Sequence, residues 1–146
     1  MPELIDILDG KTRYHSKKVE AAYRPGSAFE YSDAGFCIIE QLLVDTMEKP
    51  FSDLMNELVL EPLGMSNSLL MYPADIDPRY HLSCGHDKNG QIVRGKRAVY
   101  PYLASAGLWT TPADLGKLIV EVADGLSGKG KSGINKELMT ELIRSQ

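Results

Sequence analysis

The residues best suited to proton chemistry lie together in the segment Tyr31-Ser32-Asp33. A phenol has a pKa of about 10, so it works as a base at neutral pH only where neighbouring cations stabilise its charged form. An ionised carboxylate, such as that of Asp33, accepts hydrogen bonds but cannot donate them. A Tyr-Ser-Asp segment ahead of a helix is, however, also typical of a packed aromatic followed by a helix cap. These residues alone leave both interpretations open.

A second pattern, residues 125–132, satisfies the phosphate-binding consensus G-x-x-x-x-G-K-[ST]. That motif requires a preceding strand, whereas the residues before Gly125 begin with a helix cap and keep mainly helical spacing. Only fourteen residues follow Ser132 in the 146-residue chain, too few for the parallel sheet and the magnesium-binding aspartate of nucleotide hydrolases. A nucleotide-binding protein of this P-loop type is therefore an alternative hypothesis, and it predicts magnesium-dependent binding of ATP.

The histidines and cysteines do not form a recognisable set of metal ligands. The three histidines are irregularly spaced, which favours solvated or turn positions: His15, His81 and His86. Cys37 lies in a helical apolar pattern and Cys84 in a strand-like stretch, so both are expected to be buried lone thiols. We therefore expect no metal and no cofactor.

Several helices are expected around these residues. Apolar side chains recur at helical spacing after a cap at Ser32 or Asp33, and this stripe predicts a helix packed against a core: Phe36, Ile39, Leu42, Leu43 and Met47. A second helix is expected from Pro50 to Pro62, and a third after Thr111-Pro112, with Asp114 at the capping-box position. A last helix is expected over residues 135–144.

Two further elements are less strongly indicated. Residues 16–23 form a charged stretch that is expected to be helical. Two short stretches between Tyr80 and Arg94 flank Asp87-Lys88-Asn89-Gly90, and the Asn-Gly pair favours a β-hairpin there. The fold class expected is mainly α with a small β-hairpin (α+β), in one domain over residues 1–146.

Length and composition set the class of protein. A chain of 146 residues with 43% hydrophobic and 25% charged residues is typical of one soluble globular domain. A net charge of −4 argues against a nucleic-acid partner. We find neither an apolar run long enough to span a bilayer nor a secretory signal, and the compartment stays open.

Four segments, taken in order, resemble serine hydrolases of the class C β-lactamase and D-alanyl-D-alanine carboxypeptidase type. They are Arg24-Pro25-Gly26-Ser27, then residues 29–36 (FEYSDAGF), then residues 61–65 (EPLGM), and finally residues 105–115 (SAGLWTTPADL). Any one of them could occur by chance. Four in the family's order make the resemblance specific over the span from Arg24 to the last helix.

The resemblance implies roles for three residues. Tyr31 matches the tyrosine of the family's Y-x-N segment, which handles the proton during acylation and deacylation by a serine. Asp33 takes the position whose side chain meets the substrate amide, where the family has asparagine, so either that contact differs or the substrates are not β-lactams. Tyr102 matches a place where family members line the substrate site, although a core or hairpin aromatic is the more common role of such a residue.

Two family motifs are missing. No serine lies three residues before a lysine, the nearest approach being Thr46-Met47-Glu48-Lys49, and Lys131-Ser132-Gly133 lies in a glycine-rich loop, whereas K-T-G belongs on a strand. The chain is therefore interpreted as an internal, largely helical fragment of a hydrolase acting on β-lactam, D-Ala peptide or ester substrates, with the main sheet missing. We expect it to be inactive alone and to self-associate through exposed apolar faces. A non-enzymatic helical interaction domain is the remaining alternative.

Overall fold

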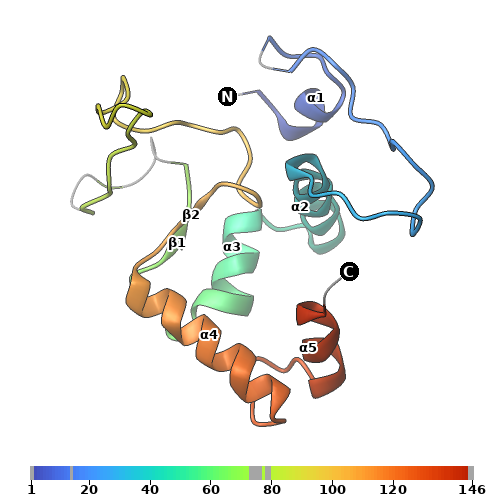
Figure 1. Ribbon diagram of the computed structural model, residues 1–146, viewed down its shortest axis with the longest axis vertical. Coiled ribbons are helices and arrows are strands. Elements are labelled where there is room, and N and C mark those ends of the chain that lie inside the picture. Colours follow the sequence, from blue (N-terminus) through green and yellow to red (C-terminus); the bar gives the residue numbers. More distant parts are fainter. Residues whose placement is uncertain (1, 14, 73–76, 78–79, 145–146) are drawn as a thin grey trace.

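Helices make up most of the regular structure, and two strands form one small antiparallel sheet (Figure 1). The computed structural model describes residues 2–13, 15–72, 77 and 80–144. The order of elements is α1 (Leu4–Leu8), α2 (Asp33–Met47), α3 (Phe51–Met55), η1 (Asn56–Leu60), β1 (Leu69–Leu70), β2 (Leu108–Trp109), α4 (Pro112–Leu126) and α5 (Lys136–Ile143). The mainly helical class expected from the sequence is confirmed.

Side-chain caps explain where the longer helices begin. The Ser32 hydroxyl accepts a hydrogen bond from the Gly35 amide at 3.2 Å and starts α2. The Thr111 hydroxyl accepts from the Asp114 amide at 3.2 Å and starts α4, with Pro112 as the first helical residue. Each cap satisfies an amide that lacks a partner within its helix. The sequence-based prediction of both helix starts is therefore confirmed.

The helix expected after Pro50 forms, but its second half is not α-helical. α3 passes directly into η1, a π-helical turn in which the Glu61 amide bonds to the Asn56 carbonyl at 2.9 Å. Pro62 lies just beyond, and Gly64 takes a positive φ of 65° that reverses the chain. The predicted stop and turn are confirmed, while the π-helical turn was not anticipated.

The helix expected over residues 16–23 is absent, and this prediction was wrong. The segment instead runs in irregular conformation beside α1, where the Val19 amide bonds to the Leu8 carbonyl at 2.8 Å. Gly10, with φ of 70°, comes so close that a Cβ there would lie 2.5 Å from the Lys17 carbonyl carbon. This tertiary contact outweighs the weak helical preference of the stretch.

The β-hairpin expected between Tyr80 and Arg94 is reduced to its turn. Gly90 has the predicted positive φ, 77°, and the Asp87 carboxylate accepts the Asn89 and Gln91 amides at 2.9 Å each. Only the isolated bridge His86↔Ile92 joins the two sides, because these exposed segments have no apolar face to bury. The sheet of the described chain instead pairs Leu69 with Trp109 and Leu70 with Leu108.

The core lies where α3 meets the sheet and the loop before β2. Phe51, Leu70 and Leu103 form its buried centre, with Val44, Met55, Tyr72 and Ala104 packed around them. At the other end, α4 and α5 form an antiparallel pair in which Met139, 1% exposed, packs on Gly125 (Figure 1). None of the described helices combines the length and the apolar character that crossing a bilayer requires.

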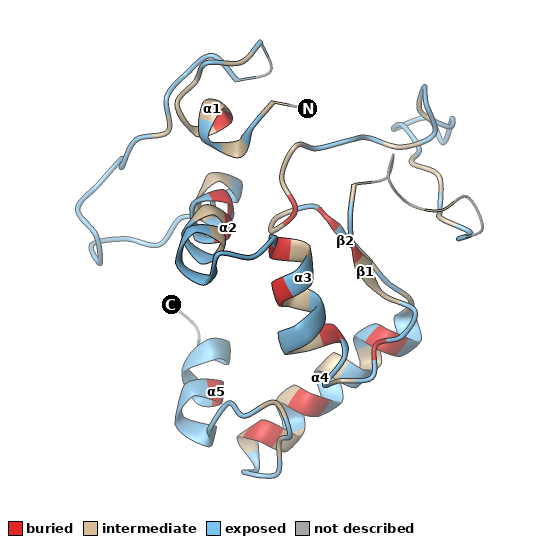
Figure 2. Ribbon diagram, turned by 180° about the vertical axis from the view of Figure 1, so that it is seen from behind, coloured by how far each residue is buried: buried red, intermediate tan, exposed pale blue. Residues whose placement is uncertain are grey.

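The apolar stripe of α2 faces solvent, which corrects the expectation that it packs on a core (Figure 2). Its exposed members are Phe36, Ile39, Leu42, Leu43 and Met47. The buried residues of α2 are Cys37 and Glu40, because this helix turns a different face toward the loop before β2. Within the described part of the chain, nothing covers the stripe.

Candidate functional site

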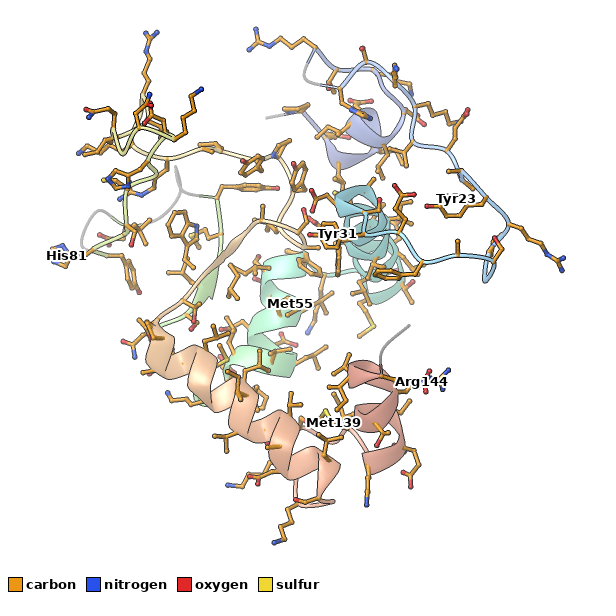
Figure 3. All side chains as sticks on the ribbon, viewed as in Figure 1. Tyr23, Tyr31, Met55, His81, Met139 and Arg144 are labelled. Carbon is orange, nitrogen blue, oxygen red and sulfur yellow. The ribbon has the colours of Figure 1, made fainter. Side chains whose placement is uncertain are left out.

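Tyr31 and Asp33 lie at the N-terminal end of α2, as the cap at Ser32 requires. The Tyr31 side chain is 67% exposed (Figure 3), and its hydroxyl donates to the Asp33 carboxylate at 2.9 Å. The Tyr31 ring also contacts Phe36, with centroids 6.2 Å apart. The hydroxyl is therefore held in one place by its acceptor while remaining open to a ligand.

The hydrogen bond to Asp33 favours the protonated form of the Tyr31 hydroxyl. It is the main reason that the pKa of Tyr31 lies above the ordinary value, and the negative charge of Asp33 acts in the same direction. A raised pKa keeps the phenol protonated at neutral pH. Tyr31 in this environment is therefore equipped to donate a proton, and it would need a nearby cation to act as a base.

Tyr102 reaches the same site from the loop before β2. Its ring stacks on that of Tyr100, with centroids 5.6 Å apart and an angle of 26° between the ring planes. Burial is the main cause that raises the pKa of Tyr102, followed by the charges of Cys37 and Asp33. The structure thus brings Tyr102 close to the start of α2, seventy positions away in the sequence.

A cavity of about 690 Å³ joins these residues. Asp33 and Tyr102 lie in its wall, and Tyr31 is tied to that wall through Asp33. The remaining described wall is largely apolar and comes from α1 and the residues on either side of it, from α2 and from the chain just before Tyr102: Pro2, Ile7, Leu8, His15, Val19, Ala34, Cys37, Val99, Tyr100 and Pro101. Two of the three residues singled out in the sequence, Asp33 and Tyr102, therefore line one cavity, and Tyr31 is hydrogen-bonded to the first of them.

Glu40 holds the loop that carries Tyr102. This carboxylate is 6% exposed, and its Oε2 accepts the Leu103 amide at 3.0 Å and the Ala104 amide at 2.8 Å. A charged acceptor pairing two amides in a dry place forms strong hydrogen bonds. Sequence reasoning missed Glu40, because a single glutamate inside an apolar helix carries no signal of its partner.

Gly107 lets the same loop fold back on itself. Its amide bonds to the Leu103 carbonyl at 2.8 Å, and a Cβ at this position would lie 2.7 Å from the Leu103 Cα and 2.8 Å from the Leu103 oxygen. Backbone atoms cannot move aside as a flexible side chain can. The glycine of Ser105-Ala106-Gly107 is therefore required by the close approach that positions Tyr102.

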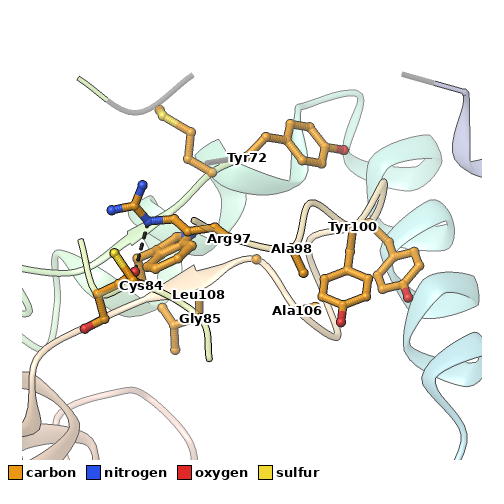
Figure 4. A pocket seen from close by; sticks show the side chains of 13 residues that line it. Tyr72, Cys84, Gly85, Arg97, Ala98, Tyr100, Ala106 and Leu108 are labelled. Atoms are coloured by element: carbon orange, nitrogen blue, oxygen red, sulfur yellow. Dashed lines mark hydrogen bonds between the residues drawn. The ribbon is translucent and has the colours of Figure 1, made fainter. Parts of the chain in front are cut away.

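A second cavity, about 320 Å³, is also lined by the tyrosine pair (Figure 4). Tyr100 and Tyr102 belong to the walls of both cavities. Arg97 crosses the smaller one, donating from Nε to the Ser83 carbonyl at 3.0 Å, with its guanidinium 5.9 Å from the Trp109 ring centre. These contacts give Arg97 a structural role in fixing the 82–97 loop to β2.

The glycine-rich loop does not have the geometry of a phosphate site. It follows helix α4, whereas a phosphate-binding loop follows a strand, and the Lys131 and Ser132 amides both donate to the Glu121 carboxylate at 2.7 Å. The Ser132 amide is the main cause that lowers the pKa of Glu121. The amides that would hold a phosphate are occupied by the chain's own carboxylate, so the P-loop hypothesis was wrong.

Asp114 was expected to serve as the acidic residue of a capping box, but its carboxylate has other partners. Its buried carboxylate accepts the Asn67 amide at 2.7 Å, the Ser68 hydroxyl at 2.9 Å and the Lys117 ammonium at 2.7 Å. The hydrogen bond from Lys117 is the main cause that lowers the pKa of Asp114. Asp114 therefore ties the start of α4 to the turn after Gly64.

The histidines and cysteines form no metal site in the part of the chain that the structure describes. Among the residues that the structure describes, no group of three or more His, Cys, Asp or Glu side chains is arranged to hold a metal ion. Cys37 is buried in α2 and Cys84 is half-buried near Arg97, and both are free thiols. Burial is the main cause that raises the pKa of Cys37, as expected of a packed thiol.

A family model described as Beta-lactamase matches residues 10–142 of the chain. The fold is similar to that of an octameric penicillin-binding protein homologue from Pyrococcus abyssi, with a TM-score of 0.66 and 20% identity. It is also similar to a penicillin-binding protein from Bacillus halodurans (0.66 and 18%). A third similar structure is D-amino acid amidase from Ochrobactrum anthropi SV3 complexed with D-phenylalanine (0.60 and 21%).

The chain corresponds to part of each of these proteins. The three comparisons cover 98%, 99% and 96% of this chain, but 30%, 42% and 40% of the respective structures. The chain therefore spans less than half the length of the structures that it matches.

Proposed function

Because the chain belongs to the Beta-lactamase family, we propose that it is the helical part of a serine hydrolase that acts on a β-lactam, D-Ala peptide or ester through a serine acyl-enzyme. The observation that carries this proposal is that Asp33 and Tyr102 line one cavity while the Tyr31 hydroxyl is hydrogen-bonded to Asp33. Tyr31 and Asp33 belong to one family segment, and Tyr102 lies just ahead of another. A chance resemblance would give no reason for them to meet.

Tyr31 is proposed to exchange the proton that moves during acylation and deacylation. Its side chain is exposed and its hydroxyl is fixed at 2.9 Å by Asp33, a residue of the cavity wall, so the hydroxyl is open to a ligand beside that wall. With its pKa raised, the phenol by itself favours the acid half of that exchange, namely protonation of the leaving group. The base half requires a cation beside Tyr31, such as the lysine of a Ser-x-x-Lys motif.

The nucleophile is proposed to lie outside these 146 residues, so the isolated chain should be inactive. No Ser-x-x-Lys occurs in the sequence, and loss of the nucleophile costs a serine hydrolase about a million-fold in turnover. Tyr31 stabilises no acyl intermediate on its own. The unit with activity is therefore the whole encoded protein.

The main sheet of the hydrolase is likewise proposed to lie outside the chain. Several helices leave large apolar side chains in solvent, including Phe36 and Leu42 on α2 and Leu138 and Leu142 on α5. The buried residues are few on both helices: Cys37 and Glu40 on α2, and Met139 on α5. Such faces are favourable only when another part of the protein covers them, and in isolation they should promote self-association.

The test is hydrolysis by the full encoded protein and its Tyr31→Phe variant. We expect nitrocefin, a D-alanyl ester or an aryl ester to be cleaved, with kcat reduced about 100-fold or more in the variant and an unchanged far-UV spectrum. Tyr80→Phe is the matched control, because that tyrosine is exposed in a loop outside the site. Equal kcat in Tyr31→Phe and wild type would overturn the proposed role.

A further inference from the structure

We propose that the cavity beside Tyr31 selects substrates that carry a protonated amino group, with Asp33 as its counter-ion and Tyr100 and Tyr102 as an aromatic wall. This names the substrate class of the site and rests on the proposed function in treating the ligand as a substrate. The class includes amino-acid amides and esters with a free amine. Neutral acyl compounds of the same shape fall outside it.

The first argument is the bonding capacity of Asp33. Its Oδ1 accepts the Tyr31 hydroxyl at 2.9 Å, which uses one of the roughly four acceptor positions of a carboxylate. A carboxylate cannot donate to a substrate carbonyl, so it offers nothing to the oxygen of a neutral amide. An ammonium group brings up to three donors, so this acceptor matches it.

The second argument is the charge of the wall. Among the described residues that line the cavity, Asp33 is the single carboxylate, and none is lysine or arginine. His15 is the one basic side chain there, and it lies exposed on the segment after α1. A cation entering the cavity therefore meets one negative charge, that of the exposed Asp33, in an otherwise largely apolar wall.

The third argument is the aromatic pair. Tyr100 and Tyr102 stack at 5.6 Å and both line the cavity with Asp33. The faces of aromatic rings attract cations that come within about 6 Å of the ring centre. A carboxylate combined with aromatic faces is suited to an ammonium group and gives a neutral group no comparable attraction.

A purely structural role for Asp33 makes a different prediction. Asp33 stands in the first turn of α2, where a negative charge stabilises a helix by complementing its dipole. If that were its whole role, removing the charge would weaken the helix slightly and leave the preference among ligands unchanged. Binding measurements separate the two roles.

The test is an NMR titration of the 146-residue chain with D-phenylalanine amide and with its N-acetyl derivative. The amide, with its free ammonium, should shift the backbone signals of Asp33 and Tyr102, and acetylation should weaken binding about tenfold or more. Asp33→Asn should remove this preference, and Tyr102→Leu should weaken the amine severalfold. Asp45→Asn, an exposed change on the same helix, should leave both affinities unchanged.

Equal binding of the two probes, no binding of either, or an unchanged preference in Asp33→Asn would each overturn the inference. Circular dichroism of every variant verifies that α2 is intact. The titration needs no catalysis, so its failure leaves the Tyr31→Phe result on the full protein standing. An inactive full protein would in turn leave a measured ammonium preference standing.

Discussion

Replacing Glu40 by alanine tests the physical link between α2 and the loop that carries Tyr102. The change removes the acceptor of the Leu103 and Ala104 amides, at 3.0 Å and 2.8 Å, and leaves both donors without a partner. Leu103 is 8% exposed and belongs to the core, so water cannot easily replace the carboxylate there.

The magnitude follows from these two hydrogen bonds. A buried donor left unpaired costs about 1–3 kcal/mol, and the half-buried Ala104 amide should fall near the lower end, so Glu40→Ala should lower the free energy of unfolding by about 2–4 kcal/mol. For a chain of this size that corresponds to a fall in Tm of roughly 5–15 °C. Glu40→Gln keeps one acceptor oxygen and should lose about half as much.

Urea unfolding and amide hydrogen exchange measure the effect. In Glu40→Ala the Leu103 and Ala104 amides should exchange faster than the rest of the core, because their acceptor is gone. Glu57→Gln is the control: its exposed ion pair with Lys49 should contribute less than about 1 kcal/mol. If Glu40→Ala unfolded at the same urea midpoint as Glu57→Gln, the account of how Tyr102 is held would be wrong.

Three other predictions follow from the described contacts. Gly107→Ala should destabilise the chain by about 2 kcal/mol or more in a thermal melt, because the added Cβ meets the Leu103 backbone, whereas Gly116→Ala, where the space is open, should not. Asp33→Asn should lower the raised pKa of Tyr31 in a ¹³C-tyrosine NMR titration, and an unchanged pKa would show that Asp33 is not the cause. The stability that this hydrogen bond contributes is present below the ordinary phenol pKa of about 10, and it disappears as the pH rises through the pKa of Tyr31 in the folded state. Light scattering should show association that grows with concentration and falls in Phe36→Glu/Leu42→Glu, whereas a monomer at every concentration would contradict the exposed apolar faces.

Local signals in the sequence predicted the local structure. The hydroxyls of Ser32 and Thr111 cap their helices as their positions indicate, and Gly90 takes the backbone angle that an Asn-Gly turn requires. The helices that follow these caps have the predicted starts. Each of these features depends on residues within about four positions of one another, which is why a single sequence was enough.

Contacts between separate elements of the fold could not be predicted from such local signals. Glu40 accepts two amides from a loop more than sixty residues further along the chain, and Glu121 accepts two from the loop that follows α4. Asp114 was assigned to its own helix cap and instead binds the turn before β1. The predicted orientation of α2 failed for a related reason: periodicity finds an apolar stripe but does not say whether this chain holds the surface that covers it.

The candidate site was predicted in part from the sequence. Tyr31, Asp33 and Tyr102 were singled out through the family resemblance; the structure places Asp33 and Tyr102 in the wall of one cavity and Tyr31 against Asp33, and their chemical roles are predictions. Tyr100, the stacking partner that completes the aromatic wall, was not found because nothing in its local sequence distinguishes it from a loop tyrosine.

Mass spectrometry of the acyl-enzyme tests the central claim most directly. The full encoded protein would be incubated with benzylpenicillin or an activated D-alanyl ester, quenched in acid and digested. The account predicts an acyl group on a serine of a Ser-x-x-Lys peptide outside these 146 residues, with slower formation or decay in Tyr31→Phe. An adduct on a serine within residues 1–146, or no adduct with any acyl donor, would contradict it.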